Sequence, residues 1–178
     1  CKMNKKLLFE APSLYFFLFR SNITSLMELK DIIKESVSIS EEASFKDAIS
    51  LMISEKTNSL LVTDNNGLLT GEVSVTDLLD AVVPEYLDGD SIAAHFVSPA
   101  MFEEATKDAQ EKQVKFFMST KITPVKLTDG IMEVASNAIA NKSARIPVID
   151  DAGKPAGIIS RRGLKHIIGD ALNISDTE

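Results

Sequence analysis

The sequence predicts an α/β (α+β) fold in which two β-α-β-β-α repeats pack sheet to sheet with pseudo-twofold symmetry. Three observations predict this fold: the chain matches itself at a fixed offset, each copy has a helical apolar period, and each copy continues with two short β runs around a glycine turn. The 178 residues, 44% hydrophobic and 25% charged, are enough for one or two compact domains.

The repeat becomes visible when the chain is shifted by 86 residues, which aligns residues 37–83 with residues 123–169 without a gap. Nine of these 47 pairs are identical, and they include the glycine of each turn and the serine of each strand-to-helix junction. Half of so small a chain cannot cover both faces of a sheet, so the copies should pack against each other through their sheets. The chain then divides into an N-terminal extension (1–26), a first repeat (27–83), a linker with a helix (84–113) and a second repeat (114–175).

Each repeat contains the same elements in the same order. A helix comes first, because apolar residues recur at i, i+3, i+4, i+7 and i+8. These residues are Phe45, Ala48, Ile49, Met52 and Ile53, and then Ile131, Val134, Ala135, Ala138 and Ile139. Ser44 and Asp47 have the spacing of a capping box at the start of the first of these helices.

Two β runs follow the helix, at 60–63 and 71–73 in the first copy and at 146–149 and 157–159 in the second. The first run of each copy ends in a turn whose glycine can adopt a positive φ. A second helix then begins at Ser74 or Ser160. Upstream, residues 29–33 parallel residues 114–118 at an offset of 85, and Pro99 is expected to open a linker helix that runs to about Lys112.

These motifs resemble the CBS (cystathionine-β-synthase-type) repeat, whose tandem pair is called a Bateman module. The second copy supplies the apolar-Pro-Val-x-Asp strand and its glycine turn in residues 145–153, and the first supplies the Gly-x-x-[Ser/Thr]-x-x-Asp junction in residues 71–77. The resemblance implies a disc-like module that often dimerises, binds AMP, ADP, ATP or S-adenosylmethionine between its repeats, and regulates an attached enzyme, channel or partner. Ligand-free adaptors also occur in the family.

The family pattern places a candidate ligand site in the first copy. The resemblance assigns the ribose to Asp77, whose carboxylate can accept two O–H bonds. Ser74 starts the same helix, where backbone N–H groups favour a phosphate, and Thr76 lies between the two. The backbone of Ser36, Val37 and Ser38 and that of Asn58, Ser59 and Leu60 would frame the base. Ser74 and Asp77 equally fit a capping box that serves only the helix, so both interpretations stay open.

The second copy departs from this pattern, because Gly163 stands where the first copy has Asp77. Ribose should therefore bind poorly in this half. Its candidate ligand-binding residues are Arg145, Ile146, Pro147, Ser160, Arg161 and Arg162. The three arginines suit phosphate, although solvated surface or ion pairs would explain them equally well. A composite site, with the nucleoside over the first copy and its phosphates on these arginines, would explain both the missing carboxylate and the basic residues of the second copy.

Charge and missing motifs argue against other functions. The formal net charge of −7 gives no positive field for nucleic acid or an anionic membrane. Cys1 is the only cysteine, which excludes a disulfide framework and favours a reducing, cytoplasmic setting. No phosphate-binding glycine loop, dinucleotide motif or nucleophile elbow occurs, and His95 and His166 have no ligand partners at metal-site spacing. We therefore expect no enzyme, no metal site and no required cofactor.

Residues 1–26 do not fit the repeat. Their apolar stretch, 7–19, is interrupted by Glu10 and Pro12 and is too short to span a bilayer. A signal peptide or a lipid-anchored Cys1 would be alternatives. If Met27 is the natural start, these residues are extraneous; otherwise they form a disordered tail or an apolar helix that packs on the module or on a neighbouring subunit.

Together these inferences predict a regulatory pair that senses an adenosine nucleotide and controls an unidentified partner protein. A ligand-free interaction or dimerisation scaffold is the alternative. We also expect a homodimer, because exposed apolar helical residues in both copies exceed what one pair of sheets can cover. These residues are Leu78, Leu79, Val82, Leu164, Ile167 and Ile168.

Overall fold

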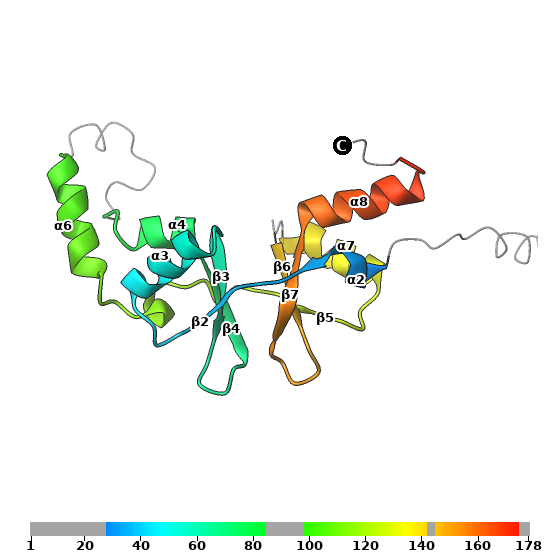
Figure 1. Ribbon diagram of the computed structural model, residues 1–178, viewed down its shortest axis with the longest axis horizontal. Helices are drawn as coiled ribbons and strands as arrows, with labels where there is room; N and C mark the ends of the chain where they lie inside the picture. Colours follow the sequence, from blue (N-terminus) through cyan, green and yellow to red (C-terminus); the bar gives the residue numbers. More distant parts are fainter. Residues whose placement is uncertain (1–27, 85–97, 142–144, 175–178) are drawn as a thin grey trace, which may run out of the picture.

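The computed structural model describes residues 28–84, 98–141 and 145–174. Two small sheets face each other in the middle of the molecule, and helices cover their outer sides (Figure 1). The strand orders are β2-β3-β4 in one sheet and β1-β7-β6-β5 in the other. The predicted fold of two repeats packed sheet to sheet is confirmed. The extension 1–26 and His95 lie outside the described residues.

The two halves contain the same series of elements. The first half has β2 (Ser38–Ser40), α3 (Phe45–Ser54), β3 (Ser59–Thr63), β4 (Leu69–Ser74) and α4 (Val75–Asp80). The second half has β5 (Val125–Lys126), α7 (Ile131–Asn141), β6 (Arg145–Ile149), β7 (Pro155–Ser160) and α8 (Arg161–Ala171). None of the helices in the described part of the chain is long and apolar enough to cross a membrane.

The linker carries α6 (Pro99–Ala109), which ends before the predicted Lys112. The reason is a contact with α3. The carbonyl of Gln110 accepts the backbone N–H of Lys46 at 3.1 Å, and the carbonyl of Lys112 accepts that of Phe45 at 2.8 Å. Residues 110–112 thus satisfy two N–H groups that the first turn of α3 cannot satisfy itself.

The two β-hairpins have the same register. Ser59 lies opposite Ser74 in the first, and Arg145 lies opposite Ser160 in the second. Their turn glycines, Gly67 and Gly153, adopt φ values of 78° and 81°, the left-handed conformation that the turns were predicted to need. The hairpins also touch across the seam, where the Leu69 N–H donates to the Gly153 carbonyl at 3.1 Å.

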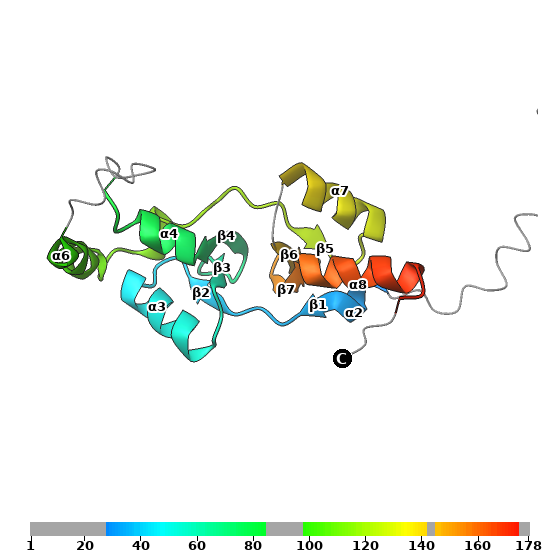
Figure 2. The same cartoon turned by 90° about the horizontal axis from the view of Figure 1, so that it is seen from above.

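The two halves exchange their N-terminal segments. Strand β1 (Ile33–Lys34) follows α2 (Leu29–Ile32) and pairs antiparallel with β7, so the start of the first repeat belongs to the second sheet. In return the 3-10 helix η2 (Val114–Phe116) buries Val114 in the first core, and Ser119 pairs with Glu72 of β4. Figure 2 shows the chain running from β1 beside α8 to β2 in the other half. The sequence repeat and the packed half are therefore different sets of residues.

Each sheet buries one face against the helices of its own half. In β3, Leu60 and Val62 point into the first core, and in β6, Ile146 and Val148 point into the second. Leu61 alternates with the two core residues of β3, so it points to the opposite face, where it is 2% exposed. The seam between the sheets is thus an apolar layer in its own right.

The predicted exposure of helical residues is wrong at several positions. Three of the residues expected on an exposed face are buried at 7% exposure: Leu78 in α4, Val82 just after α4, and Ile167 in α8. Conversely Ile53 and Ile139, expected on buried helix faces, are 73% and 78% exposed. Leu79 and Ile168 are exposed as expected. Homodimer formation stays a prediction, supported now by these four exposed residues.

Candidate functional site

A cavity of about 140 Å³ lies where the two sheets meet, and we call it the first cleft. Its lining residues are Glu35, Ser36, Val37, Glu55, Thr57, Ser59, Leu61 and Ile158. All belong to the first sequence repeat except Ile158, which comes from β7. The shape of the first cleft therefore depends on how the two repeats are oriented. A larger apolar hollow of about 480 Å³ between α4 and α6 contains none of the predicted site residues.

Ser59 joins the two repeats at this cleft. The Arg145 Nη1 group donates a hydrogen bond to Ser59 Oγ at 2.5 Å. The offset of 86 aligns these same two residues, and counterparts can touch each other only close to the pseudo-twofold axis. Arg145 does not itself line the first cleft, but it is bonded to a residue that does.

Glu72 of β4 lies beside Ser59 and Arg145. Burial raises the pKa of its carboxyl group, the Ser59 hydrogen bond and the Arg145 charge lower it, and the Asp77 charge raises it. The net effect is a pKa above the ordinary value, because desolvation is the largest cause. A half-buried carboxylate at the axis is therefore a feature of the site that its sequence motifs did not indicate.

Ser74 and Asp77 form the capping box at the start of α4. The Ser74 N–H and Oγ both donate to Asp77 Oδ2, at 2.7 and 2.5 Å, and the Asp77 N–H donates to Ser74 Oγ at 3.4 Å. The capping role is thus established. Both carboxylate bonds fall on Oδ2, and a carboxylate has two oxygens, so the geometry is compatible with a ribose hydroxyl on Oδ1.

The start of α4 offers a phosphate fewer donors than the motif suggested. The Val75 N–H donates to the Asn58 carbonyl at 3.1 Å, and Ser74 Oγ takes up the Asp77 N–H. The helix is also only six residues long, which limits its dipole. Arg145 is therefore better placed to bind a phosphate than the N-terminus of α4 is.

Of the fifteen predicted ligand-binding residues, Ser36, Val37 and Ser59 line the first cleft, and the other twelve do not. Five of these twelve have side chains placed elsewhere. Ser38 on β2 and Thr76 on α4 are exposed. Asn58 borders a different hollow, between α3 and α4. Leu60 and Ile146 point into the two cores, at 1% and 2% exposure. For Ser38, Asn58 and Leu60 the family pattern implied a role of the backbone only, which these side-chain positions leave open.

The second half keeps the helix cap but has no room for a carboxylate. Ser160 Oγ accepts the Gly163 N–H at 3.2 Å. A Cβ atom added at Gly163 would lie 3.0 Å from the Ile32 Cβ and 3.3 Å from its carbonyl oxygen. The exchanged helix α2 therefore occupies the space that an aspartate needs. Arg161 and Arg162 are exposed at the start of α8, and Pro147 is buried in β6.

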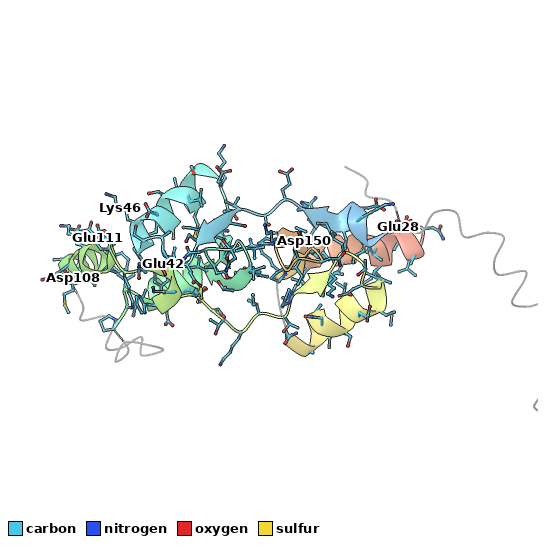
Figure 3. The ribbon with its side chains drawn as sticks, turned by 90° about the horizontal axis from the view of Figure 1, so that it is seen from below. Glu28, Glu42, Lys46, Asp108, Glu111 and Asp150 are labelled. Atoms are coloured by element: carbon cyan, nitrogen blue, oxygen red, sulfur yellow. The ribbon has the colours of Figure 1, made fainter. Side chains whose placement is uncertain are left out.

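Sequence reasoning missed several lining residues: Glu35, Glu55, Thr57, Leu61 and Ile158. A signal existed for Leu61, because it is apolar and stands between two core residues of one strand. Most other acids are remote, and Figure 3 shows Glu42, Asp108 and Glu111 at the outer end of the first half. Among the residues that the structure describes, no cluster of His, Cys, Asp or Glu could hold a metal ion.

Known proteins resemble the chain in both sequence and fold. An uncharacterized protein of Methanocaldococcus jannaschii is 27% identical over 150 residues, which cover 78% of this chain and 89% of that protein. The CBS domain of a CBS domain-containing membrane protein from Sphaerobacter thermophilus has a TM-score of 0.64 at 22% identity, covering 79% of this chain and 87% of that one. The structure of CBSX2 in complex with AMP has a TM-score of 0.56 at 25% identity, covering 83% and 97%.

The family model that describes the CBS domain matches the chain twice, at residues 29–84 and 112–170. The two matched segments make up more than half of the chain and correspond to its two sequence repeats. The chain belongs to the CBS domain family.

Proposed function

We propose that this CBS pair senses an adenosine-containing nucleotide, such as AMP, ADP or ATP, and passes the signal to a regulated partner protein. The observation that carries the proposal is the first cleft, which both repeats line and which Arg145 borders through its bond to Ser59. The similarity to CBSX2, whose structure contains AMP, supports the choice of ligand.

Each part of the ligand has a group suited to it. The base would lie between the sheets against Val37, Leu61 and Ile158, which provide an apolar wall. The ribose would bind Asp77, since Ser74, to which Asp77 is bonded, lies directly opposite the lining residue Ser59.

The phosphates would bind arginine. Arg145 keeps N–H donors beyond the one bonded to Ser59, because a guanidinium has five. Arg161 and Arg162, at the exposed start of α8, would receive phosphates that extend past the cleft.

Binding should alter the angle between the repeats. A cavity of 140 Å³ is smaller than the ~300 Å³ at which ligand pockets usually begin. The sheets must therefore separate slightly to admit a nucleoside. The ligand then stabilises the more open orientation by its difference in affinity for the two states, and a partner can recognise that orientation.

Thermal unfolding with and without AMP, ADP and ATP tests the proposal, with GMP as the control for base recognition. A ligand at 100 times its Kd should stabilise the fold by about 2.7 kcal/mol. For a chain of this size that corresponds to a rise in Tm of roughly 5–10 °C. An unchanged Tm with all three adenosine nucleotides would contradict the sensor and favour the ligand-free scaffold.

A further inference from the structure

Glu72 of β4 lies on the side of the first sheet that faces the seam. Its neighbour Val73 is buried in the first core, so the alternation along the strand turns Glu72 to the opposite face. Leu61 of β3 lies directly opposite Glu72 and lines the first cleft. Ser59, two residues before Leu61, is a diagonal neighbour of Glu72 on the same face. The carboxyl group thus lies beside two lining residues of the first cleft.

Ser59 connects this carboxyl group to Arg145. The Ser59 Oγ accepts a hydrogen bond from Arg145 Nη1 at 2.5 Å, and the Ser59 hydroxyl donates its one hydrogen to the Glu72 carboxylate. The backbone holds Glu72 in place, since its N–H donates to the Ser119 carbonyl at 3.0 Å and its carbonyl accepts the Ser119 N–H at 2.9 Å. A chain of hydrogen bonds therefore runs from Arg145 through Ser59 to a carboxylate whose backbone is fixed.

The charged groups around Glu72 come from a few elements. Arg145 of β6 favours the ionised carboxylate, and Asp77 of α4 opposes it. Glu35 and Glu55 add two carboxylates to the lining of the first cleft, whereas the lining residues from β3 and β7 carry no charge. Burial outweighs the favourable contacts, so the pKa of Glu72 is already raised in the ligand-free protein. Any ligand that adds negative charge here will favour the neutral carboxyl group further.

We propose that a nucleotide bound in the first cleft takes up a proton from solvent, and that Glu72 is the group that accepts it. A phosphate on Arg145 competes with Glu72 for the same guanidinium and places a second negative charge near it. Like charges in such partly solvated surroundings repel strongly, and protonation of Glu72 removes the repulsion.

This inference rests on the proposed function and names a form of regulation for the same site. The pKa of Glu72 is higher in the complex than in the free protein, because the phosphate adds to the causes that already raise it. The affinity for nucleotide should therefore rise as the pH falls through the pKa of the complex, and level off below the pKa of the free protein. The sensor would respond to acidification as well as to nucleotide.

The test is calorimetric titration of the whole chain with AMP at about pH 5 and about pH 8, in two buffers that differ in ionisation enthalpy. The difference in heat between the buffers gives the number of protons taken up. The phosphate of AMP itself titrates near pH 6, so each result is compared with Glu72→Gln, in which that contribution is the same. We expect Glu72→Gln to take up fewer protons and to bind AMP at least about threefold more tightly than the unmodified chain at the higher pH. At the lower pH the two affinities should agree within about twofold.

Asp80→Asn is the matched control, because Asp80 is exposed at the end of α4 and does not line the first cleft. It should keep the proton uptake and pH dependence of the unmodified chain. Melting curves at both pH values establish that the three proteins are folded. Equal proton uptake by the unmodified chain and Glu72→Gln, or the same gain in affinity in Asp80→Asn, would overturn the role of Glu72 while leaving nucleotide binding intact. Failure of the unmodified chain to bind AMP at either pH would overturn the sensor and this inference together.

Discussion

The most specific prediction concerns Asp77. The structure shows its role as a helix cap, and a second capping box in the chain provides a control for the proposed role in ribose binding. The capping box of α4 has a twin in α3, where Asp47 Oδ2 accepts the Ser44 N–H at 3.0 Å and the Ser44 Oγ at 2.7 Å. The Asp47 N–H donates to Ser44 Oγ at 3.1 Å. Neither aspartate lines the first cleft, but Asp77 is bonded to Ser74, which lies opposite the lining residue Ser59. Asp47 is exposed and bonded to Ser44, which bridges to Gln113 instead, so Asp47→Asn measures the capping cost alone.

The two substitutions should have equal effects on stability and different effects on binding. Asparagine keeps one oxygen that can accept from the serine but loses the charge, so each variant should lose less than about 1 kcal/mol of unfolding free energy without ligand. If Asp77 binds the ribose, loss of its charge should also weaken the binding free energy of the nucleotide by about 1.5–3 kcal/mol. For Asp77→Asn this means AMP affinity about 10- to 150-fold weaker, while Asp47→Asn should bind AMP normally.

Urea unfolding of the ligand-free proteins measures the free energy of unfolding, and calorimetric titration measures the affinity for AMP. If Asp77→Asn matches Asp47→Asn in both stability and AMP affinity, then Asp77 is only a helix cap, and the ribose must bind elsewhere in the cleft. The fold and the family membership would be unaffected by that result.

Three further predictions follow from packing and charge. Glu72→Gln should raise the free energy of unfolding at neutral pH, because a carboxyl group whose pKa is raised in the folded state destabilises the fold as pH rises through that pKa. In urea unfolding at different pH values, the gain in stability should vanish as the pH falls toward 4.5, the ordinary pKa of a glutamate. A gain that grows in acid would contradict the predicted direction of the pKa shift. Gly163→Ala should cost about 1–3 kcal/mol, since its Cβ would press on Ile32, and an unchanged Tm would show that α2 yields freely. Light scattering at tens of micromolar should show a dimer that buries Ile53 and Ile139, whereas a strict monomer would count against it.

The repeat and its elements could be derived from sequence because their signals are local. The period of α3 identifies Phe45, Ala48 and Met52 as core residues, and all three are buried. The turn glycines and the Ser74–Asp77 box likewise depend on dihedral angles and bonds within a few residues. The offset of 86 then implied that two similar halves must pack together, and the sheets do meet at a seam.

Contacts between distant segments were decided only by the tertiary structure. The offset of 85 aligned residues 29–33 with residues 114–118 but could not show that each segment packs in the opposite half. The same applies to Ile158 in the first cleft and to the meeting of Ser59 with Arg145. Local pattern determines which residues a strand or helix turns to one side, whereas the surface met on that side depends on how separate elements are brought together.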